Sequence, residues 1–570
     1  MWKVRRRNSG SISLHFGRDK SLTTSGQHPD SVSPSPRGLI IFAVTLAILY
    51  ASISWLRDDP KFSGAIQLTA ALRYVLTEGA IDATPEVVFQ AAASGLTAAL
   101  DPFSAYMPTE ELEYFEEETE GEYVGVGVEI KMTAGAIVIV RVFPQTSAAE
   151  AMVEPGDRIV AIDDAPTTGF ALLRVVQLMR GPEGSTVLVR IQSPEGEERR
   201  LTLERRAVSV SPFPIHGIAR SGAAYIRWTD FSDGSANRLA AIVEALSVES
   251  PVGLILDLRG NPGGLLDEAV NAAGIFLPPD ALVCRVIDRT AQETIEYRTA
   301  ESPATFPGPV VVVMDEDAAS ASEVLAAALQ ETGRAVVVGR RSFGKGWVQS
   351  VFPFDDGSAL RLSTARYYTP AGHSFGDPSL CVPDDETETP DSSWFSPSGL
   401  VPDSFVDALP VGSWEEAFAQ RGLFADFAIA YGDEWPTGEL VETLRRWSDS
   451  LAIVPEGLVA NLTGGDESEA MKSPDGISRT DWERVLRTLD SAHILDQELL
   501  FERERAALSL CLWEQRMVAV ERPDEAELEE YLSLDPDLSA ARELLEEPAR
   551  YYDFIRRRQP IAPTATVEPR

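Results

Sequence analysis

Apolar and polar residues recur with different periods along this chain, and each period predicts a different kind of element. Residues 60–118 carry apolar side chains at helical spacing, with a break at Asp101-Pro102, which predicts a small helical segment. Residues 119–207 show short alternating stretches separated by turn signals, which predict β-strands around one helix at 169–181. These changes of pattern indicate separate folding units.

Further along, a strand, a loop and a helix follow one another repeatedly. An apolar strand, a glycine loop and an amphipathic helix occur over residues 253–277, and the same plan returns over 308–330. This alternation predicts an α/β core with a largely parallel sheet. Because ligands of such sheets bind where strands end and helices begin, Ser320 and the Gly263-Gly264 loop fall at a predicted site.

The N-terminal pattern predicts a membrane segment. Residues 1–37 begin with a basic cluster and continue as a Ser/Pro-rich tract, which predicts a disordered leader. Residues 38–56 carry no charge, and as a helix they would rise about 28 Å, enough to cross a bilayer. Small residues Ser52 and Ser54 are also typical of a cleaved signal peptide, but the long leader favours an uncleaved anchor. The basic leader then places the N-terminus in the cytoplasm and the rest outside it.

Composition narrows the function classes. The chain has 570 residues and a formal net charge of -38, which argues against a nucleic-acid-binding protein. Its cysteines, Cys284, Cys381 and Cys511, are far apart and form no CxxC pair, so neither a zinc site nor a disulfide framework is expected. No cofactor or metal is predicted.

Residues 119–207 resemble a PDZ domain over nearly their whole length. The resemblance rests on the stretch from Tyr123 to Ile130 and on the turn and strand that begin at Glu154. It implies that the loop Val124-Gly125-Val126-Gly127 binds the terminal carboxylate of a peptide with an apolar C-terminus, since bare backbone N–H groups favour glycine. The glycines alone would equally permit a β-bulge.

Two residues could activate a serine nucleophile, and the residues by themselves leave the choice open. A serine hydroxyl needs a base, usually a histidine, and His216, His373 and His493 follow the membrane segment. None lies in a catalytic motif. The other route is a lysine driven toward its neutral form by burial, and Lys345 is the candidate because glycines and aromatic residues flank it.

Residues 60–410 resemble the carboxyl-terminal processing peptidases, or tail-specific proteases, which use a Ser/Lys dyad. The motifs that carry the resemblance are those at residues 99–107, 256–266, 319–339, 342–349 and 360–374. The resemblance implies that Ser320 is the nucleophile and that Lys345, 25 positions further on, is the base. Gln349, four residues beyond Lys345, would orient the lysine, and in an extended segment both would project to one face.

Acyl transfer to Ser320 also needs donors for the oxyanion. The N–H of Ala321 lies at the first turn of the predicted helix, where the helix dipole is positive. The resemblance places the second donor at Gly263 or Gly264 without choosing between them. Asp257 and Arg259 are interpreted as an architectural pair, and Ser322 and Glu323 as helix caps or supports. In this family the PDZ domain binds C-termini and gates the dyad.

The expected fold class is therefore mixed α/β in several domains, and the expected function is a membrane-anchored, extracytoplasmic serine endopeptidase. The predicted order is a leader at 1–37, an anchor at 38–56, a helical segment at 60–118, a PDZ domain at 119–207, a peptidase core at 208–410 and an acidic helical region at 411–570. The inner membrane, crossed once with the catalytic part in the periplasm, is the expected location.

Two departures from the family and two rival functions stay open. Residues 374–396 predict an added surface loop, and the helices beyond residue 410 would either form a homo-oligomer or adaptor contact or cap the core. The rivals are a Ser/His hydrolase that uses His373 and a non-catalytic scaffold that binds C-terminal peptides.

Overall fold

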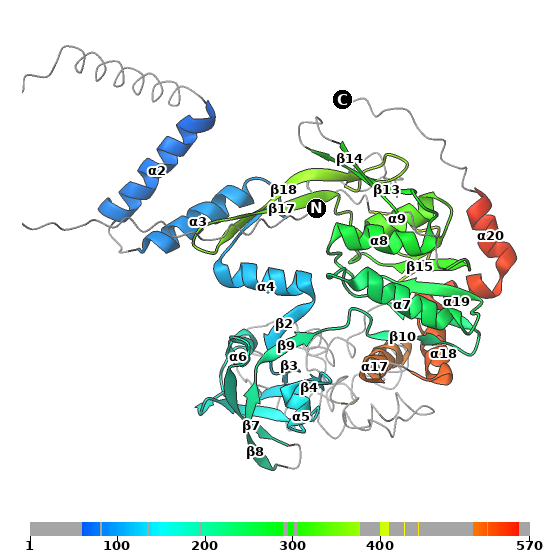
Figure 1. Cartoon of the computed structure of the whole chain (residues 1–570), viewed down its shortest axis with the longest axis horizontal. Coiled ribbons are helices and arrows are strands. Elements are labelled where there is room, and N and C mark those ends of the chain that lie inside the picture. The colour runs from blue at the N-terminus through cyan, green and yellow to red at the C-terminus, as the bar shows by residue number, and fades with distance from the viewer. Residues whose placement is uncertain are drawn as a thin grey trace, which may run out of the picture. The chain divides into compact units, whose positions relative to one another are not determined.

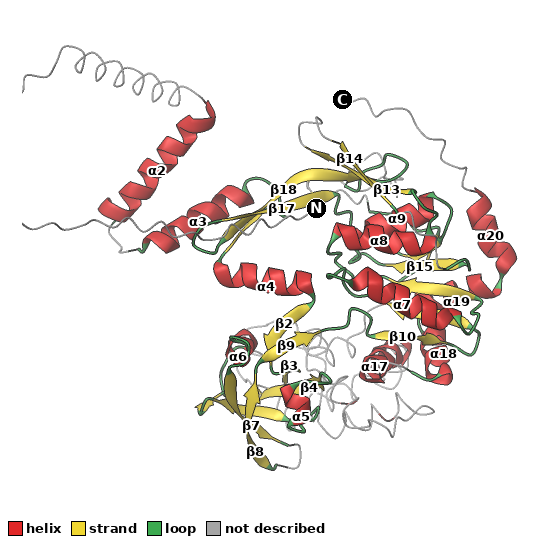
Figure 2. Cartoon of the chain, in the orientation of Figure 1, coloured by secondary structure: helices red, strands yellow, loops and turns green. Residues whose placement is uncertain are grey.

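The structure is a computed structural model (Figure 1), with its helices and strands distinguished in Figure 2. It describes residues 60–79, 83–133, 136–193, 196–288, 294–300, 306–376, 399–409, 427, 443, 505–520 and 523–557. The predicted leader and membrane segment lie outside these residues, as does most of the loop predicted at 374–396. Within the ranges described, no helix combines the length and the apolar character needed to cross a bilayer.

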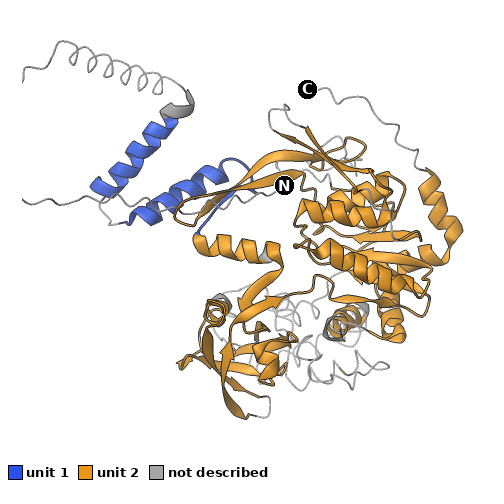
Figure 3. Cartoon of the chain, in the orientation of Figure 1, with its two compact units in different colours: residues 1–108 blue, residues 109–570 orange. Residues whose placement is uncertain are grey.

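The chain divides into two compact units, residues 1–108 and 109–570 (Figure 3). The described part of the first unit consists of α2 (Pro60–Glu78), α3 (Pro85–Ala98) and β1 (Ala105–Met107). Thr84 caps α3 by accepting the N–H of Val87 at 3.4 Å. After α3 the Asp101 carboxylate accepts the backbone N–H groups of Phe103 and Ser104, which forms the turn at the predicted break.

The second unit begins with α4 (Thr109–Glu120), so the predicted helical segment at 60–118 is shared between the two units. The PDZ segment follows as a six-stranded antiparallel sheet in the order β3-β4-β5-β7-β8, with β6 paired to β5. Its strands are β3 (Val128–Thr133), β4 (Ala136–Val142), β5 (Arg158–Ile162), β6 (Ala165–Pro166), β7 (Thr186–Gln192) and β8 (Glu198–Glu204). The helices are α5 (Ser147–Glu150) and α6 (Leu172–Met179), and β2 (Glu122–Gly125) pairs with β9 (Arg206–Ser209).

A second six-stranded sheet forms the centre of the core, in the order β10-β11-β12-β15-β16-β19. Its strands are β10 (Ile215–Ile218), β11 (Ala223–Arg227), β12 (Gly253–Asp257), β15 (Val310–Met314), β16 (Val336–Gly339) and β19 (Ser404–Phe405). All neighbours are parallel except β10 and β11, which confirms the predicted, largely parallel sheet.

The strand order explains where the helices lie. Strands β11, β12, β15 and β16 are neighbours in chain order, and parallel crossovers are right-handed, so all crossover helices fall on one face of the sheet. These helices are α7 (Ser235–Ser247), α8 (Leu266–Phe276) and α9 (Ala321–Glu331), and they share one apolar core with alternate strand residues. The opposite face therefore needs a separate cover.

Helices from the C-terminal region cover that opposite face. They are α17 (Arg505–Val520), α18 (Glu525–Leu534), α19 (Pro536–Glu546) and α20 (Pro548–Arg557). Their apolar residues form one buried cluster with Tyr225, Ile255, Val311 and Val336 of the sheet. The described helices beyond residue 410 thus cap the core, as one of the two sequence interpretations expected.

A smaller antiparallel sheet was not predicted from the sequence. It contains β13 (Leu282–Asp288), β14 (Thr294–Arg298), β17 (Trp347–Pro353) and β18 (Ala359–Tyr368). In it β17 pairs with β18, β18 with β13, and β13 with β14. The lysine loop runs from the parallel sheet into this one, because it joins β16 to β17.

Candidate active site

The candidate site lies at the carboxyl edge of the parallel sheet, where strands β11, β12, β15 and β16 end. Parallel strands bring the loops that follow them to one edge, and four loops meet here. Gly263 and Gly264 follow β12, Ser320 follows β15, and Lys345 follows β16. The site predicted from the strand-loop-helix pattern is therefore formed by segments far apart in the chain.

Ser320 has a strained backbone. Its φ of 57° and ψ of −115° lie in a region that residues other than glycine rarely adopt, and it stands directly before α9. Only 7% of the residue is exposed. Such a sharp strand-to-helix turn presents the side chain at the sheet edge, while the first N–H groups of the helix point toward it.

The glycine loop touches the Ser320 turn directly. A Cβ atom added to Gly263, whose φ is 101°, would lie 2.8 Å from Ser320 Cβ and 2.9 Å from the backbone nitrogen of Ala321. Only glycine allows this approach. The loop is also bonded to the turn, since the Asn261 carbonyl accepts the Ala319 N–H and the Ser322 hydroxyl, each at 3.0 Å.

Hydrogen bonds inside the loop distinguish the two glycines as donors. The Gly263 N–H donates to Asn261 Oδ1 at 2.9 Å, so it is already engaged. Gly264 forms a parallel bridge with Phe231, in which the Leu265 N–H donates to the Phe231 carbonyl. Because successive N–H groups of an extended backbone point to opposite sides, the Gly264 N–H points away from Phe231. Among the residues that the structure describes, neither the Gly264 N–H nor the Ala321 N–H has an acceptor.

Glu323 joins the turn at Ser320 to the lysine loop, which is residues 340–346 between β16 and β17. Its carboxylate is fully buried and accepts the N–H of Ser320 at 2.9 Å and the N–H of Lys345 at 2.8 Å, both on Oε2. Its Oε1 accepts the Gly344 N–H at 2.7 Å and the Ser342 hydroxyl at 2.5 Å. The backbone nitrogens of Ser320 and Lys345 therefore lie within two hydrogen-bond lengths of each other.

Burial and hydrogen bonding act in opposite directions on the pKa of the Glu323 carboxyl. Burial raises the pKa of its carboxyl, and the four hydrogen bonds oppose that effect because each favours the anion. Sequence reasoning assigned Glu323 only to the support of the helix. The spacing of Ser320 and Glu323 indicated the cap, but no local signal could indicate the bonds to residues 342–345.

The surroundings of Lys345 lower the pKa of its amine. Burial is the largest cause, and the nearby positive charge of Arg361 adds to it, while Glu323 acts in the opposite direction. Arg361 belongs to β18, and its guanidinium lies 5.7 Å from the centre of the Phe115 ring on α4. A lysine with a lowered pKa carries more of the neutral amine that proton abstraction requires.

Gln349 and Tyr367 are two further residues near Ser320 and Lys345 in the structure or the motif. Lys345 lies in the loop before β17 rather than in the strand, so the alternation argument that put Lys345 and Gln349 on one face does not apply. Gln349 is in β17, next to an irregularity in its pairing with β18. Tyr367 was missed as a site residue: burial raises its pKa far above the usual range, and a hydrogen bond with the Ser320 side chain acts against that.

His373 is held at the far end of α9. Its Nδ1 lies 3.2 Å from Glu331 Oε1, and Glu331 is the last residue of the helix that begins after Ser320. Eleven helical residues span roughly 16 Å. Glu331 also accepts the Thr369 hydroxyl at 2.7 Å, which ties His373 to a structural cluster. This position argues against His373 as the base for Ser320.

The predicted carboxylate loop of the PDZ domain is partly strand. Val124 and Gly125 belong to β2 and pair with β9, while Val126 is buried and its carbonyl accepts the Ala148 N–H at 3.1 Å. At Gly127, with φ 86°, an added Cβ would lie 2.2 Å from Thr146 Cβ. Packing against Thr146 alone therefore demands this glycine, and its part in peptide binding stays a prediction.

Comparison with known proteins gives the class of this fold and site. Residues 115–192 match the PDZ domain, and residues 222–386 match Peptidase family S41. A carboxy-terminal-processing protease of Bartonella bacilliformis is 30% identical over 339 residues, which cover 59% of this chain and 78% of that protein. A carboxyl-terminal-processing protease of Synechocystis sp. is 34% identical over 327 residues, covering 56% of this chain and 76% of that protein.

A solved photosystem II D1 C-terminal processing protease is 27% identical and covers 60% of this chain and 87% of that chain, with a TM-score of 0.34, which is too low to support an argument. The sequence matches with the two proteases of Bartonella bacilliformis and Synechocystis sp. show the family. A PDZ domain combined with an α/β peptidase core defines a class of serine peptidase, and the chain belongs to the carboxyl-terminal processing proteases of Peptidase family S41. This membership confirms the resemblance predicted from the motifs and argues against a non-catalytic scaffold.

Proposed function

We propose that the chain is a membrane-anchored, extracytoplasmic endopeptidase that binds protein C-termini through its PDZ domain and cleaves peptide bonds with a Ser320/Lys345 dyad. The observation that carries the proposal is the buried Glu323 carboxylate, which holds the N–H groups of Ser320 and Lys345 on one oxygen. The lowered pKa of the Lys345 amine supports its role as base.

In the proposed mechanism Lys345, as the neutral amine, takes the proton of the Ser320 hydroxyl while the serine oxygen attacks the peptide carbonyl. The N–H groups of Ala321 and Gly264 donate to the oxyanion. The lysine ammonium then protonates the leaving amine, which leaves an acyl-serine and a neutral lysine. Lys345 next takes a proton from water, hydroxide attacks the acyl group, and the proton returns to Ser320.

The direct test uses the soluble part of the chain, from residue 57 onward, incubated with casein. Cleavage by the wild-type protein, with loss of cleavage in Ser320→Ala and Lys345→Ala, supports the dyad. Cleavage that survives in Lys345→Ala but not in His373→Ala would instead assign the rival Ser/His mechanism.

We further propose that a peptide bound to the PDZ domain shifts the dyad toward its competent arrangement. The supporting contacts meet on α4, whose Glu117 pairs with Arg180 of the PDZ segment and whose Phe115 lies beneath Arg361 of the peptidase core. Arg361 in turn helps to lower the pKa of Lys345 after the larger effect of burial. A displacement of α4 would therefore reach the surroundings of the base.

Deleting residues 119–207 should change both turnover and specificity toward unstructured substrates. Adding a peptide with a free apolar C-terminus to the wild-type protein should change the rate, and the same peptide with an amidated C-terminus should not, because the amide lacks the carboxylate. Initial rates of casein cleavage measure both effects. Unchanged turnover and specificity in the deletion would reject gating.

We propose that residues 38–56 remain as a single-pass anchor in the inner membrane and that the catalytic part is periplasmic. The support is the uncharged run itself and the basic residues that precede it. The full chain should stay with membranes after alkaline carbonate extraction, whereas a chain that begins at residue 57 should be released. An N-terminal sequence of the mature protein that begins after residue 52 would show cleavage and refute the anchor.

A further inference from the structure

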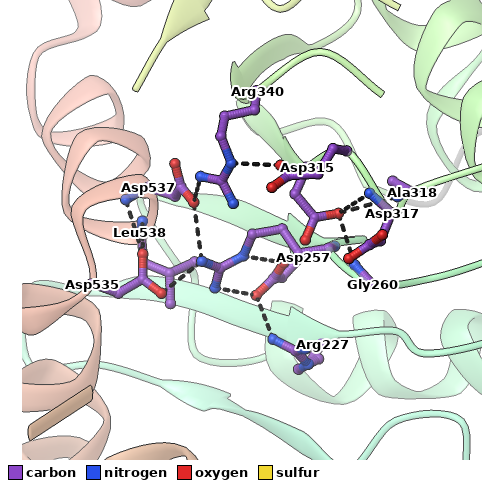
Figure 4. Close-up of polar contacts among 12 residues, drawn as sticks. Arg227, Asp257, Gly260, Asp315, Asp317, Ala318, Arg340, Asp535, Asp537 and Leu538 are labelled. Carbon is purple, nitrogen blue, oxygen red and sulfur yellow. Dashed lines mark hydrogen bonds and ion pairs between the residues drawn. The ribbon is translucent and has the colours of Figure 1, made fainter. Parts of the chain in front are cut away.

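A buried ionic cluster connects the C-terminal helices with the glycine loop of the site (Figure 4). Helix α19 begins at the cap residue Asp535, whose Oδ1 accepts the N–H groups of Asp537 and Leu538. Its other oxygen, Oδ2, accepts Arg259 Nη1 at 2.6 Å, and Asp537 Oδ2 accepts the same nitrogen at 3.2 Å. Asp535 is fully buried. One guanidinium thus bonds the first turn of α19.

The same guanidinium holds the end of β12. Arg259 Nε donates to Asp257 Oδ1 at 2.9 Å and Nη2 donates to Asp257 Oδ2 at 2.8 Å, which is a bidentate contact to the last residue of the strand. Burial would raise the pKa of Asp257, but Arg259 and Arg227 hold it well below its usual range. The pair is therefore ionised, and it fixes Arg259 relative to the sheet on one side and to α19 on the other.

The loop that Arg259 starts is the glycine loop of the candidate site. The next residue, Gly260, donates its N–H to Asp315 Oδ1 at 2.9 Å, and that carboxylate also accepts the N–H groups of Asp317 and Ala318 in the loop before Ser320. The residue after Gly260, Asn261, bonds the Ser320 turn. Hydrogen bonds at both ends and the backbone of residues 259–261 between them therefore connect α19 with the Ser320 turn.

Stability alone does not account for this cluster. Leu538, Ala541, Leu544 and Leu545 of α19 are buried against the sheet and already attach the helix. A buried ion pair adds little net stability over apolar residues of similar size, because both charges must leave water. Its directional bonds instead select one position of the helix end and of the loop. The planar fork of arginine suits that task, since it can bond two carboxylates at fixed angles.

We propose that Arg259, held by Asp535 and Asp537 of α19, is a positioning residue that sets the glycine loop for oxyanion binding, so that catalysis depends on the docked C-terminal helices. The proposal rests on the proposed function of Ser320 and the glycine loop. A displacement of about 1 Å in a catalytic group can cost about 100-fold in rate, so a small movement of this loop matters.

The variant Asp535→Asn tests the proposal in the full-length protein in detergent. Its amide oxygen can still accept the N–H groups that cap α19, but one of the two α19 charges that bind Arg259, and the one at the shorter distance, is gone. With fluorescent casein we expect kcat to fall by about 10- to 100-fold and KM to stay within about twofold, because the loop acts in the transition state rather than in substrate binding. Arg259→Lys should behave alike, since the single nitrogen of a lysine ammonium cannot reproduce the bidentate contact with Asp257 together with the bond to Asp535.

Glu529→Gln is the matched control. Glu529 of α18 also ties the C-terminal helices to the core, because it accepts the Ser221 N–H at 3.0 Å and pairs with Arg542. Ser221 precedes β11, at the amino edge of the sheet, roughly 16 Å from the carboxyl edge. Glu529→Gln should keep the wild-type kcat. The kcat values are compared under conditions in which circular dichroism shows that every variant is folded.

The following outcomes decide whether Arg259 has a positioning role. Wild-type kcat in folded Asp535→Asn and Arg259→Lys overturns the positioning role, and so does an equal loss of kcat in Glu529→Gln, which would show a general effect of loosened helices. If Asp535→Asn does not fold, Arg259→Lys decides, since it keeps the positive charge. If the wild-type protein fails to cleave casein, or Ser320→Ala still cleaves it, the proposed function falls and the positioning role falls with it.

Discussion

Replacing Ser320 or Lys345 with Ala should lower kcat for casein cleavage by at least about 10⁴-fold, and the double variant should be no worse than either single one. Nucleophile and base act as one unit, so removing either removes nearly the whole effect. His373→Ala should keep nearly full activity, because His373 is bonded to Glu331 at the other end of α9. Cleavage rates of these four variants and of the wild-type protein under one condition measure this.

The pH profile gives the same prediction a second readout. The base must be the neutral amine, and burial and Arg361 lower the pKa of Lys345. For an amine with a lowered pKa the neutral fraction rises with pH through that pKa and then stays constant. We therefore expect kcat/KM to rise with pH and to level off below the range of an ordinary lysine. A profile with one ionisation in the histidine range that disappears in His373→Ala would contradict the dyad.

The variant Glu323→Gln should lower kcat by about 100-fold or more and also lower the melting temperature. The amide keeps one acceptor oxygen, so its NH₂ group faces one of two pairs of donors: the N–H groups of Ser320 and Lys345, or the Gly344 N–H and the Ser342 hydroxyl. In either orientation one side of the contact between the Ser320 turn and the loop of Lys345 is weakened. Each buried donor left without an acceptor costs about 1–3 kcal/mol, so the turn and the loop should separate. Casein cleavage and thermal unfolding measure the two effects.

Glu331→Gln is the control for Glu323→Gln. Glu331 is the last residue of the same helix, and its carboxylate also accepts several hydrogen bonds, from the Thr369 hydroxyl and the Ala371 N–H. The variant should lose some stability and keep its kcat, since its partners lie away from Ser320. Equal losses of kcat in both variants would mean that Glu323 only stabilises α9. They would refute the idea that the Glu323 carboxylate holds Ser320 and Lys345 in position for catalysis.

The sequence predicted the parallel core because the periodicity of apolar residues is a local property of each segment. Stretches such as Val310–Met314 are buried on both faces and read as continuous apolar runs, as strands between two helical layers do. The helices that follow carry their own periodicity. The antiparallel sheet of β13, β14, β17 and β18 escaped prediction because its two hairpins, β13–β14 and β17–β18, become one sheet only where β13 pairs with β18. These two strands lie far apart in the chain, and only packing selects that pairing.

The residues of the candidate site also divide into those that local motifs indicate and those that only the tertiary structure brings there. Ser320 and Lys345 were identified through motifs, each of which is short and continuous in the chain. Glu323 and Tyr367 acquire their place only when α9, the lysine loop and β18 come together. The alternation argument for Gln349 assumed one extended segment from Lys345 to Gln349, whereas only Gln349 belongs to the paired strand β17, so the role of Gln349 stays a prediction.

By itself the sequence determined that a PDZ domain precedes the peptidase core and that the core contains a largely parallel sheet, and it singled out the candidate nucleophile and base, since periodicity and motifs depend on neighbouring residues. Only the tertiary structure decided that helices more than 100 residues beyond the peptidase motifs cover the second face of the sheet, that Glu323 holds two loops on one carboxylate, and that Arg259 bonds α19. The physical reason is that burial and directional hydrogen bonds depend on which surfaces meet, and residues distant in the chain supply the facing half of each contact.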